Sequence, residues 1–225
     1  MASTILLRTI SSVADKRIVL ANSQFARPFN IGTWTTLRIG LRLIMNNTAA
    51  TITTPRFYVG LSSGSANLVM DASTDNWCGV ASQGSWSYFA GPPKEYYNYN
   101  MRATKRVGST LTDNSSSITP DASLPADATT ADRTLLFVDI TKGSPDYTFL
   151  VRKYRIVDAA SVDVPLADFL TKVEEPTPTY TSHGVGTAKT LAVDESGGVF
   201  NHVNIGWDKS SPTIEICDLA IVKLA

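Results

Sequence analysis

The feature that most restricts how this chain can fold is a long series of short segments in which apolar and polar residues alternate. In the clearest one, TTLRIGLRLIMNN at residues 35–47, every second residue from Leu37 to Met45 is apolar, and Arg38 and Arg42 fall on the other face. A repeat of two residues is that of a β-strand, whereas a helix would scatter these side chains around its axis. Roughly a dozen such segments, bounded by Gly, Pro, Asn, Asp or Ser clusters, predict an all-β sandwich or barrel of antiparallel strands.

The strands are expected to form a single β-sandwich domain that spans residues 1–225, because no shift in composition marks a boundary. RFYVGLSSGS, residues 56–65, is expected to be the next antiparallel strand after residues 35–47. The polar stretch GSTLTDNSSSITPDASLPADATTADR, residues 108–133, has few apolar side chains to bury, and it predicts one long loop.

Only one segment has the pattern of a helix. DVPLADFLTKVEE, residues 163–175, starts with Asp163 as a possible N-cap and has Pro165 in the first turn. Four apolar residues then fall on one stripe: Leu166, Phe169, Leu170 and Val173. A single helix on a sandwich is expected to cover one open edge or end.

The segment TIEICDLAIVKL, residues 213–224, is apolar on both faces beyond Asp218. Such a strand is expected in the centre of a sheet, with a second layer over its outer face. A β-bulge at Cys217–Asp218 is the alternative, because an extra residue there would switch which face points inward. The covering layer could be a loop, the helix or a neighbouring subunit. Four side chains therefore form a candidate interface strand: Leu219, Ile221, Val222 and Leu224.

Composition argues against several kinds of partner. The 225 residues include 20 Lys and Arg against 20 Asp and Glu, so we expect no nucleic-acid partner and no attraction to an anionic membrane. No run of about 18 apolar residues predicts a transmembrane helix, and the start MASTILLRTISSVADKRIVL does not have the pattern of a secretory signal. Cys78 and Cys217 are therefore expected as two buried thiols, with one disulfide as the alternative.

One acidic pair lies on a strong strand. Glu215 and Asp218 would be the candidates for a glycosidase, but an offset of three residues places them on opposite faces unless the bulge intervenes. The E-x-D-x-x-E pattern of family-16-type glucanases would need a third acid at position 221, which is Ile221. We therefore expect a protein that is not an enzyme.

No pattern predicts a metal or another cofactor, and none is expected. His183, expected in a turn, and His202, expected in a strand, lack metal-binding spacing. Asp71, Ser73 and Asp75 have the spacing that begins a calcium loop, but the glycine and the late acid of such a loop are missing, so an Asx-rich turn is expected.

Aromatic residues gather between positions 77 and 99. Within this region GSWSYFAGPPKEYYNYN, residues 84–100, predicts two strands joined by a Gly-Pro-Pro-Lys loop. The rings could pack in the core, form a protein interface, or stack on a sugar whose hydroxyls Asn98 and Asn100 would bind. The candidate ligand or interface residues are Trp77, Trp86, Tyr88, Tyr96, Tyr97 and Tyr99.

The segments LRIGLRLIMNN, RFYVGLSSGS and WCGV, followed by VNIGWD and IEICDLAIVKL, resemble the scaffold of concanavalin-like or jelly-roll β-sandwiches. That resemblance covers about half the chain, and it implies a long strand leading into a hairpin and a last strand that returns beside the first. The MAST start, the Ser/Thr/Ala-rich loops and the neutral charge also resemble structural proteins of tailed-phage virions. That resemblance implies a decoration, fibre or tail role, with homo-oligomeric assembly; no family motif is matched residue by residue.

Three functions follow as hypotheses. The first is a non-enzymatic structural protein of a phage-like particle, located in the virion and in contact with copies of itself and with other virion proteins. The second is a carbohydrate-binding module that uses the aromatic residues. The third is a glycosidase that would depend on Glu215.

Overall fold

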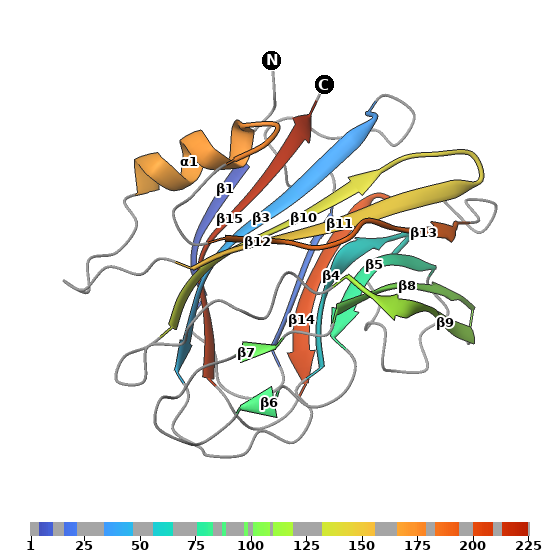
Figure 1. Ribbon diagram of the computed structural model, residues 1–225, viewed down its shortest axis with the longest axis horizontal. Coiled ribbons are helices and arrows are strands. Elements are labelled where there is room, and N and C mark those ends of the chain that lie inside the picture. The colour runs from blue at the N-terminus through green and yellow to red at the C-terminus, as the bar shows by residue number, and fades with distance from the viewer. Residues whose placement is uncertain are drawn as a thin grey trace.

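The structure is a computed structural model that describes residues 5–10, 16–21, 34–46, 56–64, 76–82, 87–88, 97–98, 101–108, 110–118, 132–155, 166–178, 183–193, 200–208 and 213–224. Figure 1 shows two large antiparallel sheets with one helix on the outside. The chain is thus an antiparallel β-sandwich with one short helix, and this confirms the fold class that the alternating segments predict.

The seven-stranded sheet contains both the first and the last strand of the chain. Its spatial order is β1 (Ile5–Ile10), β15 (Thr213–Leu224), β3 (Thr36–Asn46), β10 (Asp132–Thr141), β11 (Asp146–Arg155) and β12 (His183–Val185), and β13 (Lys189–Ala192) also pairs with β11. β15 lies between β1 and β3, so the last strand is central and returns beside the first, as expected.

The six-stranded sheet has the order β2 (Lys16–Ala21), β14 (His202–Asp208), β4 (Arg56–Ser62), β5 (Trp77–Ser82), β8 (Met101–Val107) and β9 (Thr110–Ser117). β6 (Ser87–Tyr88) and β7 (Tyr97–Asn98) form a separate antiparallel pair, as the hairpin pattern predicts. β4 follows β3 in the chain but crosses to the other sheet, where it pairs with β14 and β5. β4 is thus the next strand along the chain and antiparallel to its neighbours, as expected, but those neighbours belong to the other sheet.

Two strands form where the sequence predicts none. β9 lies inside the polar stretch of residues 108–133, so that stretch is not one long loop; residues 119–131 lie outside the described part of the chain. β12 starts at His183, where a turn is expected. β9 is an edge strand that pairs only with β8 in the sheet order, and an edge strand can form with few apolar side chains, so its alternation signal is weak.

The core lies between the two sheets, and in the described parts of the central strands alternate residues point into it. Leu37, Ile39 and Leu41 of β3 are fully buried there, opposite Val59 and Leu61 of β4. Burying each such side chain contributes roughly 1.5–3 kcal/mol relative to leaving it in water. The period of two in the sequence therefore marks the inner face of each sheet.

The sequence of β15 leaves two alternatives, a central strand covered on both faces or a β-bulge at Cys217–Asp218, and the structure shows both. Its register against β3 shifts between Ile216 and Asp218, which is the β-bulge expected at Cys217–Asp218. Beyond the bulge Leu219 and Ile221 pack in the core between the sheets, while Val222 points to the outer face. The strand is thus central, bulged and covered on both sides.

The layer over that outer face is the helix α1 (Leu166–Glu174), which covers the seven-stranded sheet and not an edge or end of the sandwich (Figure 1). The buried cluster between them contains Leu135, Phe137, Phe169, Val173, Ala220 and Val222. Gly40 lets the helix come close, because a Cβ there would lie 2.5 Å from Cγ2 of Val173. The helix packs at this position because β10 and β15 are apolar on both faces. Their outer faces form a second hydrophobic surface, and the apolar stripe of α1 buries it.

Candidate functional site

Arg38 is the most unusual side chain under α1, because it is a fully buried cation. Its Nε and Nη2 donate to the two carboxylate oxygens of Asp139 at 2.6 and 2.8 Å. Nη1 and Nη2 also donate, over 2.5–3.2 Å, to main-chain oxygens at the C-terminal end of α1, those of Val173, Glu175 and Pro176. These carbonyls have no partner in a helix that ends there, so Arg38 joins β3, β10 and α1 into one unit.

Asp218, the described member of the candidate acidic pair, forms an ion pair with Arg42. It is 1% exposed and faces the same outer layer as Arg38. A carboxylate that is buried and bound by a guanidinium holds strands together and is poorly placed to exchange protons with a substrate. The side chain of Glu215 lies outside the described residues.

The candidate interface strand is buried within the chain. Leu219 and Ile221 belong to the core between the sheets, Val222 is fully buried under α1, and Leu224 packs against the same cluster. The covering layer is thus the helix, and in this structure these four side chains do not form a free surface for a neighbouring subunit.

The histidines stand apart from one another. His202 of β14 lies beside Asn201, with Nδ1 and Oδ1 2.5 Å apart, and His183 belongs to the other sheet. Within the described residues no group of three His, Cys, Asp or Glu side chains is arranged to hold a metal ion. The possible calcium turn at residues 71–75 lies outside them.

Cys78 is buried in the core as a thiol. The side chain of Cys217 is not among those described, so the expected state of that cysteine stays a prediction. In the part of the chain that the structure describes, no helix is long and apolar enough to span a membrane, since α1 has only nine residues.

Trp77 is the one aromatic candidate whose side chain the structure describes. It lies on the outer face of the six-stranded sheet but is only 2% exposed. The indole lies close over the backbone, because a Cβ at Gly60 or Gly79 would be 2.9 or 2.8 Å from its Cε2 or Cζ2. Tyr58 meets it edge to face with ring centres 6.4 Å apart. Packing is therefore the role that its surroundings support.

The other aromatic candidates are placed only by their backbone or not at all. Tyr88 and Tyr97 are Cα partners in the β6–β7 pair. Trp86, Tyr96 and Tyr99 lie outside the described residues.

The outer face of the six-stranded sheet, on which Trp77 lies, also contains polar residues that the sequence pattern does not single out. Asn204 Nδ2 donates to Ser62 Oγ, which donates to the carbonyl oxygen of Gly64 at 2.6 Å. Asn204 Oδ1 and Trp77 Nε1 are buried and make no hydrogen bond. An alternating NHVNIGW pattern indicates only that Asn204 is on the polar face; its burial depends on side chains that lie far away in the sequence.

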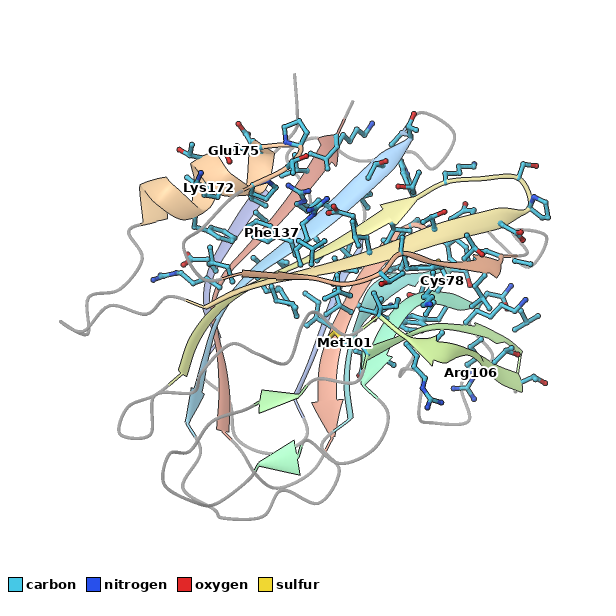
Figure 2. All side chains as sticks on the ribbon, in the orientation of Figure 1. Cys78, Met101, Arg106, Phe137, Lys172 and Glu175 are labelled. Carbon is cyan, nitrogen blue, oxygen red and sulfur yellow. The ribbon has the colours of Figure 1, made fainter. Side chains whose placement is uncertain are left out.

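Arg106 of β8 is the second residue that the pattern misses. It is 6% exposed, and its Nε donates to the carbonyl oxygen of Gly108 at 2.9 Å. Its Nη1 is buried and makes no hydrogen bond. Figure 2 shows Arg106 beside β8 and β9. Lys172 of α1 and Glu175, just beyond the end of that helix, lie on the opposite side of the molecule.

Comparison with known proteins does not assign this chain to a family. No protein-family model matches the chain, and no curated protein matches it by sequence. Among solved structures it is similar to peanut lectin in complex with a nine-residue peptide, with 8% identity and a TM-score of 0.36 over 98% of this chain and 90% of that one. A likeness at that level says nothing about what this chain binds.

Proposed function

We propose that this protein is a non-enzymatic structural component of a phage-like particle, as a capsid decoration, fibre or tail protein, that acts in the virion through protein–protein contacts and as a homo-oligomer. The observation that carries the proposal concerns Asp218, the described candidate for catalysis, and Trp77, the described candidate for ligand stacking. Both side chains are buried, and they contact other residues of the fold. The protein would therefore act through contacts between its surface and other proteins. The resemblance of the composition to tailed-phage proteins supports the location.

The molar mass of the purified chain, measured by light scattering over a dilution series, tests this proposal. The expected result is a trimer or larger species that survives dilution. A stable 24.3 kDa monomer that also has no affinity for its own particle would overturn it.

Carbohydrate binding is the second candidate, and the β6–β7 pair favours it because Tyr88 and Tyr97 are direct Cα partners there. Trp77 would not stack on a sugar while it is 2% exposed, so binding would fall to the other aromatic candidates. A glycan array probed with the folded protein tests this, and no signal above background would count against it.

A further inference from the structure

β1 is the outermost strand of the seven-stranded sheet, and the sheet order ends there. Among the described residues it pairs only with β15, so no described strand lies beside the N–H and C=O groups on its other side. Proteins commonly protect such an edge with charged residues, prolines or a very short strand. β9, an edge strand of the other sheet, follows that rule, because its sequence TLTDNSSS is polar apart from one leucine. β1, with the sequence ILLRTI, is mostly apolar.

The register of β1 shows that the apolar rows on both faces of the sheet extend to this edge. Leu7 is the Cα partner of Leu219, which packs in the core between the sheets. Leu6 is the Cα partner of Ala220, which belongs to the cluster under α1. Because cross-strand partners share a face of the sheet, apolar residues occupy both faces at the edge strand.

The opposite side of the sandwich is closed within the chain. β13 pairs with β11 of the seven-stranded sheet and also lies against β8 and β9 of the six-stranded sheet (Figure 1). Lys105 Nζ of β8 donates to the carbonyl oxygen of Ala192 in β13 at 2.6 Å, which joins the two sheets there. On the other side the two sheet orders end at β1 and β2, and no described strand lies beyond them. The β1 side is therefore where a further strand can be added.

We propose that β1 pairs with β1 of a second copy of this chain, antiparallel across a two-fold axis, so that two seven-stranded sheets join into one. Such a pair is self-complementary, because each subunit presents the same main-chain groups and the same apolar residues to the other. The second copy thus supplies hydrogen-bonding partners for the edge and apolar residues for both faces. Arg8, the one charged residue of β1, is already the Cα partner of Asp218, so the contact does not need a new counter-charge. This inference rests on the proposed homo-oligomeric function and names the surface that it uses.

Single cysteines introduced one at a time at residues 5–10 test the pairing directly. In an antiparallel pair, Cα atoms that lie opposite each other are about 4.5–5.5 Å apart, and a disulfide can bridge that separation. The cysteine nearest the two-fold axis should therefore meet its own copy and form a covalent dimer under mild oxidation, seen by non-reducing electrophoresis. The controls are the wild type, which has only its own two cysteines, and Thr112→Cys at an exposed position of β9.

Two threonines on the two edge strands give a matched pair of further variants. Thr9→Lys places a positive charge on β1, and lysine is a residue that natural edge strands use against pairing. Thr112→Lys places the same charge on β9. We expect Thr9→Lys to raise the concentration at which the oligomer dissociates by about tenfold or more, and Thr112→Lys to leave it within about twofold. Light scattering over a dilution series measures both, and circular dichroism verifies that each variant is folded.

A dimer, or a larger assembly with an even number of subunits, that cross-links through β1 supports the inference. If the wild type is an oligomer but no cysteine in β1 cross-links, or if Thr112→Cys cross-links equally, the site is wrong while the proposed function stands. Equal shifts in Thr9→Lys and Thr112→Lys would also overturn the site. So would a trimer, because two-fold pairing leaves its third subunit without a partner. A wild type that is monomeric throughout removes both the site and the homo-oligomer.

Discussion

Replacing Asp139 by asparagine should reveal how α1 is held on the sheet. The Asp139 carboxylate binds the fully buried Arg38 at 2.6 and 2.8 Å and also lies 3.4 Å from Arg152 Nε. Removing one member of a buried pair leaves the other charge uncompensated, which typically costs about 3–5 kcal/mol. Because Asp139→Asn leaves two cations without their counter-charge, we expect a loss in that range in the free energy of unfolding.

Urea unfolding followed by circular dichroism measures this loss. The control is the double variant Arg38→Met with Asp139→Leu, which leaves no charge of that pair buried and should be more stable than Asp139→Asn alone. A loss under about 1 kcal/mol for Asp139→Asn would refute the reasoning, since it would mean that water compensates Arg38 as well as the carboxylate does.

Three further substitutions test the packing. Gly40→Ala should destabilise the fold by about 1–3 kcal/mol, because its Cβ would lie 2.5 Å from Val173 Cγ2, and adding Val173→Ala should restore part of the loss in thermal unfolding. Phe169→Ala should cost about 3–5 kcal/mol in urea unfolding, and a loss below about 1 kcal/mol would mean that α1 does not depend on this ring. Gly79→Ala should disturb the β4–β5 pairing and the Trp77 indole, because its Cβ would overlap the carbonyl oxygen of Val59 and lie 2.8 Å from Trp77 Cζ2; a lower thermal unfolding temperature and a changed near-ultraviolet circular dichroism spectrum are expected, and no change in either would contradict the close approach.

The inner faces of the sheets could be predicted from the sequence because local alternation alone determines them. Leu37, Ile39 and Leu41 of β3 lie in the core, as the period of two requires. The bulge at Cys217–Asp218 could be anticipated for the same reason, since the apolar pattern of β15 changes there. β9 could not, because a polar edge strand forms by pairing with β8 and shows little hydrophobic pattern of its own.

The position of α1 could not be predicted, because an apolar stripe shows that a helix is buried and does not show against what. The surface beneath it exists only where Gly40 lies between Phe137 and Ala220 in the sheet register. These residues are far apart in sequence, so their adjacency is a property of the strand order. The same holds for Trp77, whose burial depends on Gly60 of the neighbouring strand as well as on its own segment.

Arg42 and Arg106 look alike in sequence, since each lies on the polar face of an alternating strand, yet the structure predicts opposite effects when each loses its charge. Arg42→Met would leave Asp218, which is 1% exposed, as a buried carboxylate without its partner, and should cost about 3–5 kcal/mol.

Arg106→Met would instead remove a buried charge that has no carboxylate among the described residues. The gain from removing an unsatisfied buried donor, about 1–3 kcal/mol, exceeds the loss of the one hydrogen bond to Gly108, so the isolated subunit should become about 1 kcal/mol more stable. Urea unfolding at low protein concentration, where any oligomer has dissociated, measures both variants. Destabilisation of the subunit by both substitutions would show that Arg106 has its partner within its own chain. A gain in subunit stability would show that the buried charge of Arg106 is kept at a cost to the stability of the fold.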